Sequence, residues 1–170
     1  MNEPNEIQLH LLRHAHAGDP MKWKGPDEVR PLTEKGRQQS ERLGILLARA
    51  GFRPDAILSS PLTRALETAR LIGAALDVPV TVVRGLGEPL DLEAIEALLA
   101  GAGSPRRPIL VGHDPDFSLL AAELSGATDL PVRKATLVRI DVSLPLRPGS
   151  GILRWLLPPD LLGAATEVDR

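Results

Sequence analysis

Short apolar runs of strand length alternate with longer segments of helical period along this sequence, and this alternation restricts the fold more than any other feature. The runs lie at 7–13, 56–59, 80–83 and 109–112. Strands that alternate with helices are typical of a parallel sheet with helices packed on its faces. We therefore predict an α/β fold, a three-layer α/β/α sandwich with a mostly parallel sheet.

Segments of helical period follow each of these runs. The first helix is expected to begin at a Thr33 cap and to stop at Gly51, since threonine favours helix N-caps and glycine favours helix ends. The second is expected to open at Ser60-Pro61, with serine as the cap and proline in the first turn. The third and fourth helices are expected at 92–99 and 117–124.

Two more strand-like runs lie near the end of the chain, at 136–142 and 152–157, with prolines and glycines between them. They are expected to close the sheet as an antiparallel edge. With 170 residues, 43% of them hydrophobic, the chain suits one domain with a substantial core. We predict a single domain over 1–170, in which 1–6 and 161–170 are peripheral tails.

Composition narrows the environment and the partners that we expect. Cysteine is absent, so disulfides and zinc ribbons are excluded, and a cytoplasmic location fits. The net charge of −2 argues against general affinity for nucleic acid or for anionic membranes. No apolar run approaches the roughly 18 residues of a membrane span, and the polar N-terminus does not resemble a signal peptide. A monomer is the expected state.

Chemically active side chains follow the ends of three predicted strands. Arg13-His14 follows the first run, Ser60-Pro61 the second and His113 the fourth. In an open parallel sheet, ligands bind outside the carboxyl ends of the strands. We therefore expect these three segments to meet in one site.

The residue types at this site suit a phosphate dianion. Arg13 and Arg64 offer planar forks that match phosphate oxygens, and the first turn of the second helix favours an anion. Neutral imidazole is a competent nucleophile, so we predict that His14 attacks phosphorus. Both arginines and a protonated His113 are expected to stabilise the transition state without a metal or a cofactor. Backbone N–H groups near Ser60 are expected to assist.

Four blocks of sequence resemble the motifs of the histidine phosphatase superfamily, also called the phosphoglycerate mutase-like family. They are LLRH at 11–14, PLTEKG at 31–36, SSPLTRALETA at 59–69 and VGHDP at 111–115. An isolated Arg-His pair is a weak signal, whereas all four blocks in this order and spacing are a strong one. The resemblance runs from Ile7 to about Pro159. It implies a phosphoglycerate mutase-like fold and a phosphohistidine intermediate on His14.

Within the superfamily, the sequence is most similar to the SixA-type phosphohistidine phosphatases. The small size, the RPLT segment at 30–33 and the Trp155…Pro158 ending carry this similarity. It implies hydrolysis of phosphohistidine on a protein, such as a phosphotransfer domain of a signalling relay. Two alternatives remain, a metal-independent phosphomonoesterase for a small phosphate ester and a non-catalytic phosphate-binding module.

The acid that protonates the leaving group stays open. In larger relatives it is a glutamate after the third strand, and the resemblance implies Glu88 for this role. Asp19 and Asp114 are competing candidates. The family often has an acidic residue where this chain has His16, so that position supplies no acid here.

Two more residues near the first motif have alternative interpretations. His14-Ala15-His16 resembles the His-x-His pair of metal-dependent phosphoesterases, but the chain has only four histidines, and we expect His16 at the pocket edge or in solvent. Arg30 lies in a long loop after His14, and loops of this length are often functional. It either reaches the phosphate or the substrate protein, or forms a salt bridge within the loop.

Overall fold

The computed structural model describes residues 6–165 of the chain. The strands are β1 (Glu6–Arg13), β2 (Ala56–Ser59), β3 (Val80–Val82), β4 (Pro108–Gly112), β5 (Leu137–Ser143) and β6 (Ile152–Leu157). The helices are α1 (Glu34–Arg49), α2 (Thr63–Leu76), α3 (Leu92–Gly101), α4 (Asp116–Ser125) and α5 (Asp160–Ala165), and two 3-10 turns are η1 (Asp27–Val29) and η2 (Arg84–Gly87). The predicted boundaries of these elements agree with the observed ones or differ from them by one or two residues. Helix α5 was not predicted.

The six strands form one sheet in the order β3-β2-β4-β1-β5-β6. Strands β3, β2, β4 and β1 pair in parallel, whereas β5 is antiparallel to both β1 and β6. Strand β6 therefore runs in the same direction as β1, and β5 alone is reversed. This arrangement confirms the mostly parallel sheet with an antiparallel edge region.

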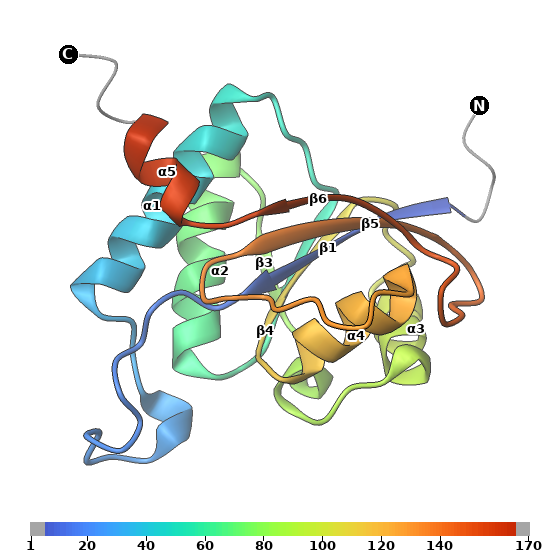
Figure 1. The fold of residues 1–170 in the computed structure, drawn as a ribbon. Helices are drawn as coiled ribbons and strands as arrows, with labels where there is room; N and C mark the ends of the chain where they lie inside the picture. The colour runs from blue at the N-terminus through green and yellow to red at the C-terminus, as the bar shows by residue number, and fades with distance from the viewer. Residues whose placement is uncertain (1–5, 166–170) are drawn as a thin grey trace.

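Helices cover both faces of the sheet, with α1, α2 and α5 on one side and α3 and α4 on the other (Figure 1). Successive strand residues point to opposite faces, so each side receives its own core. In β1, Leu11 packs in the cluster that contains Phe117 of α4, whereas Leu12 packs with Leu43 of α1 and Ile72 of α2. The three-layer prediction is confirmed.

Helices α1 and α2 begin in different ways. Thr33 caps α1 as predicted, because its Oγ1 accepts a hydrogen bond from the Gly36 N–H at 3.2 Å. The predicted Ser60 cap of α2 is wrong, since the helix begins at Thr63 after Leu62. The Ser60 hydroxyl instead accepts from the Leu62 N–H, in a turn that precedes the helix.

The short helix α5 corrects the expectation that 161–170 is a peripheral tail. Its Leu162 is only 3% exposed and shares a core cluster with Leu43 and Leu47 of α1. Six residues are too few for a helical period to be recognised in the sequence. At the other end, Glu6 is part of β1 rather than of a tail. The remaining tail residues that we expected, 1–5 and 166–170, lie outside the described part of the chain.

Within residues 6–165, every helix is too short or too polar to cross a lipid bilayer.

Candidate active site

The three strand ends bring their side chains together at one rim of the sheet, as predicted. The imidazole rings of His14 and His113 lie with their centroids 5.4 Å apart. His113 Nε2 lies 2.7 Å from the Ser60 Oγ. The Ser60 N–H donates to the carbonyl of Val111 at 2.9 Å, and the Leu62 N–H donates to the Ser60 hydroxyl. These two N–H groups are therefore used by the fold, and assistance from other backbone N–H groups near Ser60 stays a prediction.

A hydrogen bond to the backbone holds His14 in one tautomer. Its Nδ1 lies 2.8 Å from the carbonyl oxygen of Ala15, and a carbonyl only accepts, so Nδ1 carries the proton. This leaves the lone pair on Nε2. The Ala15 peptide is itself fixed, because its N–H donates to the Thr68 hydroxyl of α2 at 3.1 Å.

The surroundings of His14 also keep its imidazole neutral. The residue is 6% exposed, and this burial lowers the pKa of its imidazole to about 3. The hydrogen bond to the Ala15 carbonyl acts in the opposite direction, because it favours the charged form. The positive charges of Arg64 and Arg13, and that of His113 when it is protonated, contribute to this lowering of the pKa. Near neutral pH, Nε2 is therefore unprotonated and its lone pair is free of a proton.

The surroundings of His113 favour its neutral form. Burial, with a smaller contribution from the nearby Arg64 guanidinium, lowers its pKa to about 4. Near neutral pH the imidazole is therefore neutral in this structure, and protonation of His113 during phosphoryl transfer stays a prediction. Its Nδ1 is buried and has no hydrogen-bond partner.

Each of the two arginines is anchored by one end of its guanidinium group. Arg13 donates from Nη1 to the Asp114 carboxylate at 3.2 Å and to the Val132 carbonyl at 3.1 Å. Arg64 donates from Nη1 to the Asp27 carbonyl at 2.8 Å, and its Nη2 lies 2.9 Å from the Asp27 Oδ2. In both residues the Nε atom is buried and unpartnered.

The site therefore concentrates hydrogen-bonding groups whose partners are missing. Among residues 6–165, six buried side-chain nitrogen or oxygen atoms have no partner, and three of them belong to Arg13, Arg64 and His113. Buried polar groups are nearly always hydrogen-bonded, so such a concentration at one place indicates a ligand site. Two of the three atoms belong to permanently charged guanidinium groups, which favour an anion.

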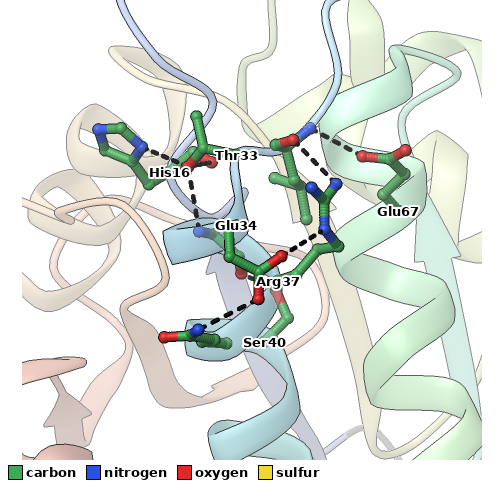
Figure 2. Close-up of polar contacts among 9 residues, drawn as sticks. His16, Thr33, Glu34, Arg37, Ser40 and Glu67 are labelled. Atoms are coloured by element: carbon green, nitrogen blue, oxygen red, sulfur yellow. Dashed lines mark hydrogen bonds and ion pairs between the residues drawn. The ribbon is translucent and has the colours of Figure 1, made fainter.

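The loop that follows His14 is closed at its base by His16 and Thr33 (Figure 2). The His16 carbonyl accepts from the Thr33 N–H at 3.0 Å, and His16 Nδ1 lies 2.7 Å from the Thr33 hydroxyl. His16 is half-buried and contributes to this closure, rather than only lying at a pocket edge. Within the described residues, no group of three or more His, Cys, Asp or Glu side chains is arranged to hold a metal ion.

The end of the same loop is tied to both neighbouring helices (Figure 2). The Leu32 N–H donates to Glu67 Oε2 of α2 at 2.7 Å, and Arg37 Nη1 of α1 donates to the Leu32 carbonyl at 3.1 Å. Arg30 forms a salt bridge within the loop, with 2.8 Å between its Nε and Asp27 Oδ1. This was one of the two roles that the sequence left open for Arg30. Asp27 was not among the site residues predicted from the sequence, because no motif or period marks it.

The three candidate acids lie in different environments. Asp114 accepts from Arg13 and from the Ser118 hydroxyl and N–H, so it acts as an anchor. Asp19 accepts from the Met21 N–H in an exposed turn. Glu88 is exposed and directly follows Gly87, where an added Cβ would lie 3.3 Å from the Ser60 hydroxyl. Glu88 thus follows a residue that lies close to Ser60, whose hydroxyl contacts His113.

Comparison with known proteins agrees with this geometry. The histidine phosphatase superfamily (branch 1) model matches residues 9–98. The phosphohistidine phosphatase SixA of Escherichia coli K12 is 26% identical over 169 residues, which cover 95% of this chain and 100% of that protein. The adenosylcobalamin/alpha-ribazole phosphatase of Salmonella typhimurium is 47% identical over 58 residues, 34% of this chain and 28% of the relative.

The fold is also that of solved relatives. A structure of the protein histidine phosphatase SixA complexed with tungstate has a TM-score of 0.78 at 24% identity, and the match covers 92% of this chain and 99% of that one. The matched family model, the sheet topology and the paired histidines lead to one conclusion: this chain belongs to the histidine phosphatase superfamily.

Proposed function

We propose that this protein is a metal-independent phosphatase that hydrolyses its substrate through a phosphohistidine intermediate on His14. The observation that carries the proposal is the set of unpartnered donors on Arg13, Arg64 and His113 beside a neutral His14. A phosphoryl group placed among them meets positive charge on several sides, and such charge stabilises the transition state of phosphoryl transfer. The arginines supply this charge, so the mechanism requires no cofactor.

In the first step, the Nε2 lone pair of His14 forms a bond to phosphorus while the bond to the leaving group breaks. The proton on Nδ1 stays on its hydrogen bond to the Ala15 carbonyl. The leaving group takes the electron pair, and Glu88 supplies a proton where one is needed. In the second step, water attacks phosphorus, the electron pair returns to Nε2 and inorganic phosphate leaves. The proton that the water loses passes to the Glu88 carboxylate.

The substrate that we propose is phosphohistidine on a protein, within a cytoplasmic signalling relay in which this protein acts as a monomer. The similarity to SixA over nearly the whole chain supports this substrate. The chemistry agrees, because a substrate imidazole that is protonated on its second nitrogen leaves as a neutral ring. Such a leaving group needs little help from an acid, which suits an exposed Glu88.

A small phosphate ester is the second candidate, and a cavity of about 240 Å³ beside the loop favours it. The cavity is lined by Lys22, Trp23 and Arg30, among others. An indole ring next to two cations suits the organic part of a small anionic ester. The short match to the alpha-ribazole phosphatase is consistent with this candidate.

The test compares phosphate release, in excess EDTA, from a phosphohistidine-bearing phosphotransfer protein and from an aryl phosphate, with wild type and His14→Ala. Faster release from phosphohistidine that persists in EDTA and disappears in the variant supports the proposal. Release only from the aryl phosphate assigns the small-ester function. Phosphate binding without release from either substrate identifies a binding module, and release that EDTA abolishes contradicts metal independence.

A further inference from the structure

We propose that Asp27 is a positioning residue that holds Arg64 in the orientation needed to bind the substrate phosphoryl group. The inference rests on the proposed function and extends it to the loop between β1 and α1. Nothing in the sequence motifs includes Asp27, and its side chain is half exposed, as for an ordinary loop residue. Its contacts, however, connect it to both Arg64 and Arg30.

Asp27 binds the guanidinium of Arg64 at two points. Its backbone carbonyl accepts from Nη1 at 2.8 Å, and its Oδ2 lies 2.9 Å from Nη2. The Arg64 side chain is only 9% exposed, so few other orientations are open to it. Asp27 takes one contact from each Nη atom on the loop side, and the Nε is buried and unpartnered. The anchor thus leaves the Nε–H and a second N–H on each Nη of Arg64 for the ligand.

Arg30 holds the second oxygen of the same carboxylate. Its Nε lies 2.8 Å from Asp27 Oδ1, and its Nη1 donates to the Ala17 carbonyl at 2.7 Å. The Asp27 carboxylate therefore lies between two guanidinium groups, and the Arg30 hydrogen bond in particular keeps the pKa of Asp27 below its usual value. One negative charge between two positive ones leaves a net positive charge, so Asp27 does not cancel the attraction for a phosphate dianion.

The same contacts argue against a second interpretation, in which Asp27 occupies the phosphate position and must leave before substrate binds. A competitor needs freedom to move, whereas Asp27 is held through a backbone carbonyl and through both carboxylate oxygens. Arg13 is anchored in the same manner, by the Asp114 carboxylate and the Val132 carbonyl, and also retains an unpartnered Nε. Both arginines of the site are thus oriented by a carboxylate and a carbonyl.

The two interpretations predict opposite effects of Asp27→Asn on anion binding. The asparagine turns an N–H group toward one of the two guanidiniums, so Arg64 loses its fixed orientation. We expect sulfate to bind more weakly and kcat/KM for phosphate release to fall by about 10-fold to 10²-fold, as for other small misplacements of a catalytic group. Asp27→Glu, which keeps the charge, is expected to restore part of this loss. Unfolding temperatures of both variants check that the fold is intact.

Glu28→Gln is the matched control, because it removes one negative charge from the next residue, which is exposed. We expect it to leave sulfate binding unchanged or slightly tighter. Sulfate that binds Asp27→Asn as tightly as wild type, or more tightly, contradicts the positioning role. An equal loss in Glu28→Gln also contradicts it, because the effect is then one of general charge.

A spectroscopic readout separates this inference from the proposed activity. The Arg64 Nε–H signal in a ¹H–¹⁵N NMR spectrum is identified by its loss in Arg64→Lys. In wild type we expect one sharp signal that shifts when sulfate is added, and in Asp27→Asn a broadened signal with faster solvent exchange. An unchanged signal overturns the inference even where phosphatase activity is present. If wild type releases no phosphate, the proposed function fails while the positioning of Arg64 is still measured.

Discussion

His14 and His113 face each other from the ends of the adjacent parallel strands β1 and β4, with 5.4 Å between their ring centroids and 53° between the ring planes. Burial lowers both pKa values, to about 3 for His14 and about 4 for His113. The site therefore carries its positive charge on arginines, and both imidazoles are neutral near pH 7. A dianion placed between the rings changes this balance, because negative charge favours protonated imidazole.

Anion binding is accordingly expected to take up protons. The pKa of His113 rises when a dianion arrives, so at pH 6 the sulfate complex binds up to about one more proton than the protein without added sulfate. Calorimetric titration with sulfate in two buffers of different ionisation enthalpy measures this uptake. The uptake is expected to vanish in His113→Asn. Equal heats in both buffers contradict the prediction, and uptake that survives in the variant assigns the proton to another group.

Arg64→Lys is expected to lower kcat/KM by about 10²-fold or more, although it conserves the charge. An ammonium group cannot bind both Asp27 oxygens and still direct a further fixed N–H at the phosphoryl group. Steady-state kinetics with the preferred substrate measures the effect. Arg154→Lys is the control, since Arg154 pairs with Asp141 on the edge of the sheet. A comparable loss in the control contradicts the assignment of Arg64.

The sequence predicted which residues gather at the rim, because the motifs at 11–14, 59–69 and 111–115 lie at the ends of β1, β2 and β4. Arg13-His14 and Gly112-His113 stand where an apolar run stops, so the order of the strands brings them together. The proximity of the two histidines followed from this pattern alone. Which of these residues act in catalysis stays a prediction.

The features that the sequence did not predict depend on contacts across the fold. Asp27 and Arg64 are 37 positions apart and share no period. Ser60 has the residue type of a helix cap, but its hydroxyl is shared between His113 and the Leu62 N–H, and the helix begins later. The neutral state of His113 follows from its burial beside Arg64, which no local motif encodes.

Gly36→Ala is expected to damage both stability and activity. An added Cβ would lie 2.1 Å from the His16 carbonyl, a backbone atom at the base of the loop that cannot move aside. We expect a loss of about 1–3 kcal/mol or more in the free energy of unfolding, as for other overpacked sites. Gly101→Ala is the control, since an added Cβ there meets nothing within 4 Å. Urea unfolding measures both variants, and an unchanged Gly36→Ala contradicts the tight loop closure.

Buried histidines are expected to make the fold sensitive to acid. His10 is fully buried and its pKa is lowered from 6.5 to about 4, chiefly by burial. The unfolded chain therefore binds the proton first, and stability falls as the pH drops from about 6.5 towards 4. Between pH 7 and pH 5, His10 alone accounts for about 2 kcal/mol. Urea unfolding at both pH values should show a smaller difference in His10→Phe, and an unchanged difference contradicts this assignment.

The central claim is that His14 is the residue that becomes phosphorylated. Its most direct test is a rapid-quench experiment with a ³²P-labelled phosphohistidine protein, followed by peptide mapping of the labelled enzyme under alkaline conditions, which preserve phosphohistidine. We predict a transient label on His14 that is absent from His14→Ala and precedes the release of phosphate. Label on His113, or full phosphate release by His14→Ala, would contradict the account.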